Sequence, residues 1–353
     1  MEVGMLHIPS IRLAGSEDAQ SVFEFIQGFA RRFGSVSCEN SSGQMERKRV
    51  IDFIKKDGAV GRIRDQLASE KPPFQCLIAE NQSIPVGGAL YFPAFSDWTH
   101  SSYPWLEDLY AKDITDAGDN RIICKELIRT LVRDAVSDGA PRIETRSLVA
   151  DRDTRVFYTE LGMSITSEWE GFRVDLPAPL RTVPSNGFSV RLADKRDMRS
   201  VAMFIQSSAR VQGVADKVNR KNTIEKLESC FDSSAFECVI AERRGVANGF
   251  AVFYQAYSSW EQCSYLMIED LHSFFSRQGT GLALISRVYD IAEKRGLSRV
   301  ETRIRQSSLS APSAVKFVEA MGMRKVPGPR WRTFRMELTS DVLKGLGLYD
   351  LVS

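Results

Sequence analysis

The second half of this chain repeats the first half. Short segments recur in the same order, and Ile78 matches Ile240, which gives an offset of 162 residues over the best-matched stretch. The paired segments are 78–80 with 240–242, 106–109 with 268–271, 142–146 with 299–303, and 169–173 with 331–335. A repeat of this length far exceeds the roughly 20 to 50 residues of a solenoid unit. Each copy is therefore expected to bury its own core and fold as a domain.

The boundary between the copies is marked by composition. Residues 176–187 contain three prolines, one glycine and several small polar side chains, a pattern typical of a linker. We therefore expect an N-terminal domain over 1–178, a linker over 179–187, a C-terminal domain over 188–341 and a tail over 342–353.

The composition, with 43% hydrophobic and 26% charged residues over 353 positions, is typical of a soluble globular protein. No apolar run reaches the roughly 18 to 20 residues of a membrane helix, and the first residues lack the basic and apolar parts of a secretion signal. A cytoplasmic location without membrane contact is therefore expected. Six cysteines without CxxC spacing and only three histidines argue against a metal site.

The two copies differ in charge. Residues 1–178 contain 21 Lys and Arg against 27 Asp and Glu, a balance of −6, whereas residues 179–353 contain 26 against 18, a balance of +8. The second copy is therefore suited to an anionic partner, although a solvated surface explains the same charges equally well.

The order of predicted elements is the same in both copies. Turn signals, capping residues and hydrophobic periodicity predict a strand, two helices, three antiparallel strands, a long helix, a strand, a short helix and a last strand. The predicted helices cover 17–32, 44–69, 120–138 and 152–161 in the first copy and 195–211, 219–230, 280–296 and 312–321 in the second, and the last strands cover 167–176 and 331–338. The charges from Glu46 to Arg49 are expected on a solvated helix face. This order predicts an α/β (α+β) fold with a mixed sheet, in which the long helix connects neighbouring parallel strands.

A glycine-containing loop opens the long helix of the second copy. Its residues are Ser276, Arg277, Gln278, Gly279, Thr280, Gly281 and Leu282. Glycines let backbone N–H groups turn towards a ligand, and a helix N-terminus carries partial positive charge, so the loop suits a pyrophosphate. A tight turn without a ligand explains the two glycines as well.

Three motifs occur in order in the second copy: Tyr257 to Trp260, Ile268 to Leu271, and Gly279 to Gly281. This series resembles the GNAT acyl-CoA-dependent N-acyltransferases, and within them the spermidine/spermine (diamine) acetyltransferase branch. The first copy repeats the first two motifs, so the resemblance covers most of both copies. It implies two tandem GNAT domains, each with a mixed, mostly antiparallel sheet, flanking helices and a splayed central pair of parallel strands. It also implies acetyl-CoA or another acyl-CoA as co-substrate, bound by residues 276–282 and by the strand at Leu271 and His272.

Each copy departs from the family pattern at a different place. In the first copy Ile122 and Cys124 replace the two glycines, which predicts loss of CoA binding because close backbone approach needs glycine. In the second copy Val318 stands where the family has a tyrosine that protonates the departing thiolate, whereas the first copy keeps Tyr158 there. One working cleft is therefore expected, in the second copy, with the two halves packed as an internal pseudo-dimer.

The resemblance implies roles for further residues. Glu269 matches the glutamate near the acceptor amine and is our candidate base, with orientation of a cationic substrate as the alternative. The candidates for the missing acid are Tyr257, Tyr265, Cys263, His272 and water. The residues expected to contact the substrate are Trp260, Asp270, Glu107 and Tyr158.

Three functions fit these features. The first is an acyl-CoA-dependent N-acetyltransferase that acts on the amine of a small molecule. The second is an aminoacyl transferase that uses aminoacyl-tRNA on the same tandem scaffold, although the sequence has no dense basic stripe with interleaved aromatics. The third is a non-catalytic CoA-binding module, which Val318 motivates. The sequence leaves open whether the chain is a monomer or a homodimer.

Overall fold

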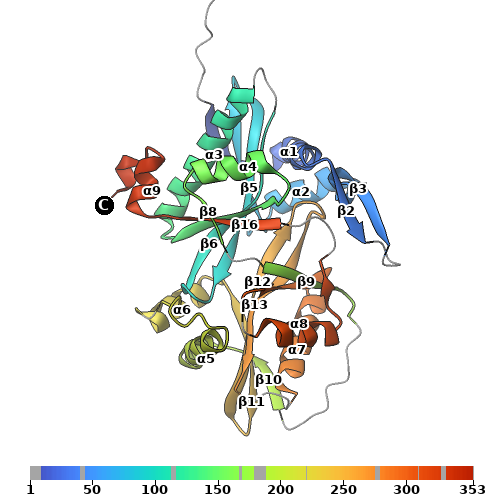
Figure 1. Cartoon of the computed structure of the whole chain (residues 1–353), viewed down its shortest axis with the longest axis vertical. Coiled ribbons are helices and arrows are strands. Elements are labelled where there is room, and N and C mark those ends of the chain that lie inside the picture. The colour runs from blue at the N-terminus through green and yellow to red at the C-terminus, as the bar shows by residue number, and fades with distance from the viewer. Residues whose placement is uncertain are drawn as a thin grey trace, which may run out of the picture.

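The computed structural model describes residues 9–39, 44–112, 117–166, 169–178, 188–219, 221–274, 279–308, 310–326 and 331–352. These residues form two seven-stranded sheets with helices on both faces, as Figure 1 shows. The mixed sheets confirm the predicted fold class. No helix in this part of the chain is long and apolar enough to cross a membrane.

The two sheets have the same topology. In order across the first sheet, the strands are β1 (Ser10–Leu13), β4 (Gln75–Asn81), β5 (Ile84–Ser96), β6 (Ser101–Ala111), β7 (Arg142–Leu148), β16 (Trp331–Glu337) and β8 (Ser164–Ile165). In order across the second, they are β10 (Phe188–Leu192), β11 (Glu237–Arg243), β12 (Val246–Ser258), β13 (Cys263–Ser273), β14 (Arg299–Arg305), β9 (Trp169–Asp175) and β15 (Arg324–Lys325). Only β6 with β7 and β13 with β14 are parallel among these pairs. These two parallel pairs are the ones that the long helices were predicted to connect.

The helices also repeat from one half to the other. The first half contains α1 (Ala19–Arg32), α2 (Ala59–Leu67), α3 (Ala117–Ser137) and α4 (Arg152–Glu160), and the second contains α5 (Met198–Val211), α6 (Thr223–Asp232), α7 (Thr280–Lys294) and α8 (Ala311–Ala320), followed by α9 (Ser340–Gly345). In the second half, α5 and α6 lie on one face of the sheet and α7 and α8 on the other (Figure 1). Each sheet is therefore covered on both sides.

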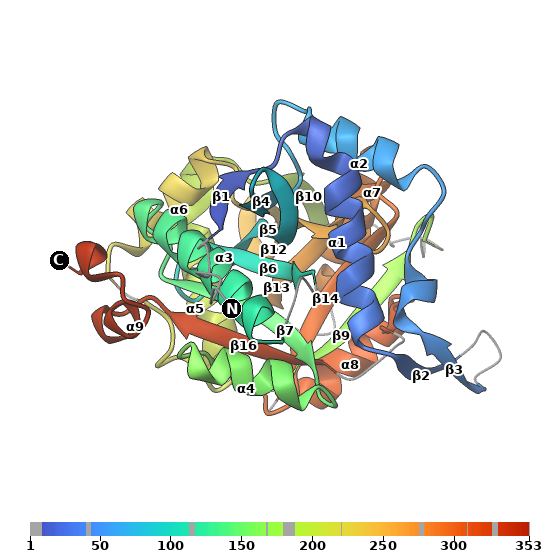
Figure 2. The same cartoon turned by 90° about the horizontal axis from the view of Figure 1, so that it is seen from above.

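The last strands of the two halves are exchanged. Strand β9, from the first copy, pairs with β14 of the second sheet from Trp169 opposite Arg305 to Asp175 opposite Arg299. Strand β16, from the second copy, pairs with β7 of the first sheet (Figure 2). The expectation that each copy completes its own sheet and core is therefore wrong. The matching sequences of β9 and β16 give each strand the same alternation of buried and exposed side chains, so either can occupy either place.

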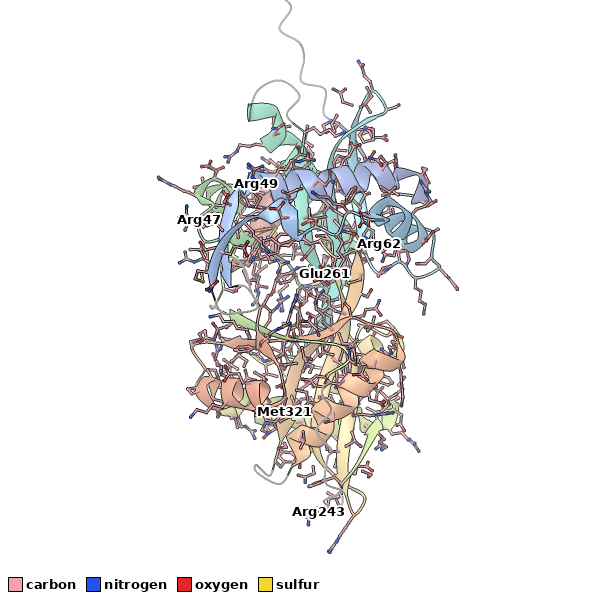
Figure 3. The ribbon with its side chains drawn as sticks, turned by 90° about the vertical axis from the view of Figure 1, so that its right-hand side faces the viewer. Arg47, Arg49, Arg62, Arg243, Glu261 and Met321 are labelled. Carbon is pink, nitrogen blue, oxygen red and sulfur yellow. The ribbon has the colours of Figure 1, made fainter. Side chains whose placement is uncertain are left out.

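A second correction concerns residues 44–69, which are not one helix. They contain β3 (Met45–Arg49), which pairs with β2 (Ser35–Glu39), then a short 3₁₀ turn (Val50–Phe53) and α2. All five residues of β3 are exposed, so this segment has no apolar face that could hold a helix against the core. Arg47 and Arg49 lie on this hairpin at the edge of the first half (Figure 3). The charged run is therefore solvated, as expected, but on a strand.

One of the three hydrophobic clusters of the described residues contains side chains from both halves. It contains residues of α1 and α5 together with aromatic pairs that join the halves, such as Phe95 with Phe236, whose ring centroids lie 4.3 Å apart, and Phe74 with Tyr257 at 4.4 Å. Arg62 and Glu261 lie where the halves meet (Figure 3). This shared core brings the ends of β5 and β6 against the second half, next to the site described below.

Candidate active site

The site begins where two parallel strands separate. Strands β13 and β14 are paired from Leu266 opposite Val300 to Ile268 opposite Thr302, and no pair follows in these fully described strands. The Thr302 hydroxyl donates to the carbonyl oxygen of Ile268 at 3.1 Å, at the last paired position. The register between β12 and β13 shifts at this point, so Glu269 has no partner on β12. This bulge directs Glu269 to the point where the strands part.

A cavity of about 640 Å³ lies at this point. Both halves of the chain line it. From the second half come Glu269, Asp270, Leu271 and His272 of β13, Gly281 of α7, Arg303 and Arg305 of β14, and Phe317 and Val318 of α8; from the first half come Asp97, Trp98, Tyr103, Arg142, Glu144 and Trp169. A volume of this size is in the range of small-molecule sites.

One end of the cavity is formed by the start of α7. Gly279 precedes the helix with a φ of 84°, in the left-handed region that favours glycine. Gly281 lines the cavity, and a Cβ there would lie 3.1 Å from the Phe317 ring, so a larger side chain would have to displace that ring. The hydroxyl of Thr280 is buried and has no partner among the described residues. Leu282 is half-buried on the same turn, whereas Ser276, Arg277 and Gln278 lie outside the described residues.

The corresponding region of the first half is a helix. Helix α3 already begins at Ala117, ahead of Ile122 and Cys124, the positions that match the glycines of α7. Cys124 is buried in the core of the first half. The first half therefore has no loop at the place where the second half has its glycines.

Glu269 is held without a direct partner. It has no hydrogen bond or salt bridge to a side chain of the described residues, and burial raises its pKa to about 7, against the opposing effect of Arg303 and Arg142. The matching Glu107 of the first half is bound instead, because Arg146 donates to it at 2.7 Å and the Trp105 indole at 2.9 Å. Of these two matched glutamates, Glu269 is the one that lines the cavity and has no side-chain partner among the described residues.

Two further carboxyl groups lie beside Glu269. Asp270 accepts a hydrogen bond from the Ser208 hydroxyl at 2.9 Å. Asp97 of the first half lies close by, and burial together with the charges of Asp270 and Glu269 raises the pKa of Asp97 well above its usual range. Burial also raises the pKa of Asp270, to about 6. The raised pKa favours the protonated form of Asp97 beside Asp270 at the boundary between the halves.

Of the predicted acids in the second copy, His272 alone lines the cavity. Its Nε2 lies 2.9 Å from the Ser207 hydroxyl, and burial lowers its pKa, so the ring is neutral near pH 7. Tyr257 is fully buried and donates to Gln66 at 2.8 Å, Tyr265 lies under the guanidinium of Arg299, and Cys263 lies near Ser298.

The predicted substrate contacts fall in different places. Asp270 lines the cavity, but Glu107, Trp260 and Tyr158 do not. Trp260 packs against Phe53 in the interface between the halves. Tyr158 is buried in the core of the first half, where its ring lies 5.4 Å from that of Phe334 on the exchanged strand β16.

Sequence reasoning missed the residues that the first half contributes to the cavity, and Arg305. The sequence signal that could have found Asp97 and Arg305 is a difference between the copies at matching positions. Asp97 stands where the second copy has Ser259, and Arg305 stands where the first copy has Leu148. The described residues contain no group of three or more His, Cys, Asp or Glu placed to hold a metal ion.

Comparisons with known proteins agree with this arrangement. No protein-family model matches the chain. A stretch of 118 residues is 31% identical to thialysine N-epsilon-acetyltransferase of Caenorhabditis elegans and covers 33% of this chain and 72% of that protein. The Mus musculus protein of the same name is 22% identical over 158 residues, which cover 42% of this chain and 91% of the mouse protein. The fold resembles the crystal structure of a GCN5-related N-acetyltransferase from Sphaerobacter thermophilus, with a TM-score of 0.51, 12% identity and coverage of 94% of this chain and 96% of that one.

Proposed function

Because the chain belongs to the GCN5-related (GNAT) family of N-acetyltransferases, we propose that it transfers an acetyl group from acetyl-CoA to the primary amine of a small molecule in the cavity between its halves. The observation that carries this proposal is the unpaired Glu269 at the point where β13 and β14 separate, in the same cavity as Gly281. The names of the two relatives describe acetylation of an epsilon nitrogen, so their acceptor is an amine too.

The donor end of the site is assigned to the second half. Family members use acetyl-CoA as co-substrate. The left-handed Gly279, the Thr280 hydroxyl without a partner among the described residues, and the cavity-lining Gly281 suit a phosphate-bearing ligand at a helix N-terminus. Leu271 and His272 lie beyond the last residue of β13 that pairs with β14, so a backbone N–H that points away from β12 there can donate to the carbonyl oxygen of a thioester.

The acceptor end is assigned to Glu269. An ammonium group must lose a proton before it can attack a thioester, and a carboxyl group with a pKa of about 7 can take that proton at neutral pH. The C–N bond then forms as the C–S bond breaks, the attacking nitrogen gives up its second proton, and the departing sulfur takes one up. Val318 cannot carry this proton, so the neutral ring of His272 or water relays it from nitrogen to sulfur.

The first half is assigned a supporting role. Asp97, Trp98 and Tyr103 form a wall of the cavity, and Asp97 lies beside Asp270 there. The first half lacks the glycine-containing loop at Ile122, so it has no site for a second acetyl-CoA.

The proposal is tested by acetyl-CoA binding and by product formation. Calorimetry of Gly281→Ile should show loss of acetyl-CoA binding, because the side chain would meet Phe317 and fill the donor end. Gly345→Ile is the matched control, since a Cβ there meets nothing within 4 Å. Acetyl-CoA with a mixture of primary amines should yield N-acetyl products, detected by mass spectrometry. Unchanged affinity in Gly281→Ile, or no product from any amine, would contradict the proposal.

A further inference from the structure

Arg303 and Glu269 are neighbours in the cavity that do not pair. Burial raises the pKa of Glu269, and the charge of Arg303 is the largest of those that oppose this effect. Arg303 nevertheless makes no hydrogen bond or salt bridge with Glu269 or with any other carboxylate that the structure describes. Its guanidinium carbon lies instead over the Trp105 ring, 4.1 Å from the ring centre. Arginine and carboxylate form strong charge-assisted hydrogen bonds when they meet, so the separation of these two groups has a structural cause.

Trp105 belongs to the first half and lies behind the cavity wall. It is 2% exposed and is not one of the residues that line the cavity. Its indole N–H donates to one oxygen of Glu107 at 2.9 Å, and Arg146 donates to the other oxygen at 2.7 Å. The ring is thus fixed by burial and by a charged hydrogen-bond partner, with its face towards Arg303. The face of an indole attracts a guanidinium electrostatically, so this contact stabilises Arg303 where it lies.

The matching arginine of the first half behaves differently. The residues that match between the halves are Glu107 and Glu269, Arg146 and Arg303, and Trp105 and Met267. Trp105 lies opposite Glu144 on β7, just as Met267 lies opposite Glu301 on β14, so the two occupy the same place in the fold. Arg146 donates directly to Glu107, although the Trp331 ring lies 4.9 Å from its guanidinium carbon. The arginine thus pairs with its glutamate where the other half has methionine at this place, and does not pair where the other half has tryptophan.

On the basis of the proposed function, we propose that Trp105 is a positioning residue for acetyl transfer, which holds the guanidinium of Arg303 against its ring, near Glu269 but not paired with it. The carboxylate of Glu269 then stays free for the acceptor amine. A paired carboxylate would be a weaker base, because contact with an arginine stabilises its charged form.

Other groups also face Glu269 and contribute to its titration. The charged ones are Arg142 and Glu144 of β7, Asp270 of β13 and Asp97 of β5. Burial raises the pKa values of Tyr103 on β6 and Tyr254 on β12, so these two phenols are neutral near pH 7. Replacement of Trp105 leaves all of these side chains in the protein, so a change in the titration of Glu269 reports on Arg303.

Trp105→Met gives the first half the residue that the second half has. Arg303 should then contact Glu269, as Arg146 contacts Glu107, and stabilise its charged form. The pKa of Glu269 should fall by about one unit or more, which moves the inflection of kcat/KM with pH to below 7. Above that inflection kcat/KM should be lower by about tenfold or more, because a paired carboxylate accepts a proton less readily. Affinity for acetyl-CoA, measured by calorimetry, should not change.

The titration of Glu269 is also followed without substrate, by NMR of protein with isotope-labelled glutamate carboxyl groups. Glu269→Gln identifies its signal. Trp331→Met is the matched control: it removes the ring that lies under Arg146, outside the cavity lining, and should leave the titration of Glu269 in place. Trp105→Phe keeps an aromatic face for Arg303 and should restore most of the wild-type profile.

Arg303→Lys supplies the test if Trp105→Met does not fold. It keeps the positive charge but loses the planar group that stacks on the ring, so it should also lower the pKa of Glu269. In an Arg303→Met background, Trp105→Met should cause no further shift, because Trp105 acts through Arg303.

An unmoved titration in Trp105→Met, or in Arg303→Lys if only that variant folds, would overturn the inference, and so would the same shift in the absence of Arg303. A moved titration with an unmoved rate profile would overturn it too, because Glu269 would then not be the base. Absence of product from every amine would contradict the proposed function, while the titration without substrate would still show whether Trp105 keeps Arg303 from Glu269.

Discussion

At the scale of single residues, the two halves use the same glutamate in opposite ways. Glu107 is held by Arg146 and by the Trp105 indole and does not line the cavity. Glu269 lacks these partners, and burial raises its pKa to about 7. The duplicated residue is thus held by side chains in one copy, and in the other it is the group to which we assign the reaction.

The raised pKa of Glu269 predicts the pH dependence of the reaction. Below about pH 7 the group is protonated and cannot accept the amine proton, so kcat/KM should rise with pH through an inflection near 7. Glu269→Gln should lower kcat by roughly 10²-fold or more and remove that inflection, while acetyl-CoA affinity holds. Rate measurements from pH 5.5 to 9 would show this.

Glu107→Gln is the matched comparison. It should lower stability, because Arg146 and Trp105 lose a charged partner, but leave the inflection in place. A normal kcat with a raised acceptor KM in Glu269→Gln would mean that Glu269 binds the substrate and does not take its proton.

At the scale of elements, the end of the chain belongs to the first half. After β16 enters the first sheet, α9 follows it and buries Leu343, Leu346 and Leu348 in the core of that half, beside α3. The segment expected to be a tail is thus part of the packing, although it follows the second copy in the sequence.

A chain that ends at Thr339 should therefore be less stable. Burial of a leucine side chain stabilises a fold by about 1.5 to 3 kcal/mol, so loss of three should lower the free energy of unfolding by at least about 3 kcal/mol. Urea denaturation would measure the change. A chain that ends at Leu348 keeps all three leucines and loses the exposed Tyr349. Its free energy of unfolding should therefore fall much less. Equal stability of the two truncated chains would contradict this role for α9.

Some elements and cavity residues can be predicted from the sequence, and others cannot. Helices such as α1 and α7 are predictable because apolar residues recur with helical spacing. Glu269 to Leu271 are predictable as cavity residues because motif and repeat coincide there, and Gly281 because its motif stands at a predicted helix start, where the first copy differs. The β2–β3 hairpin is not, since a charged run carries no periodicity. The strand exchange is not predictable either, because β9 and β16 have nearly the same sequence pattern. Residues such as Asp97 reach the cavity only through packing between the halves, which no local pattern encodes.

At the scale of the whole molecule, the exchange makes each half depend on the other. Strand β16 lies between β7 and β8, so the first sheet is interrupted without a strand from the second copy. The cavity depends on the same association, because Asp97 and Glu144 of the first half and Glu269 of the second line it together.

Residues 1–178 alone should therefore not form a native monomer. In two such fragments β9 can take the place of β16 in the partner copy, so we expect a homodimer, measurable by light scattering. Addition of residues 179–353 should convert it to a one-to-one complex with the acetyl-CoA affinity of the intact chain. A monomeric fragment with a cooperative unfolding transition would show that the first half completes its own sheet.

The exchanged strand β16 also constrains the order of events during synthesis. Domains in a nascent chain generally fold as they leave the ribosome, the N-terminal one first. Here the first sheet lacks an internal strand until residues 331–337 emerge, long after β7 has emerged. Strand β7 has an open edge for all of that time, and an open edge is a template for pairing with another chain. Neighbouring nascent chains on one messenger RNA can therefore pair wrongly through this edge. Slower translation should raise the yield of folded protein little, because it prolongs the time for which the edge is open. A chaperone that covers the open edge should raise that yield.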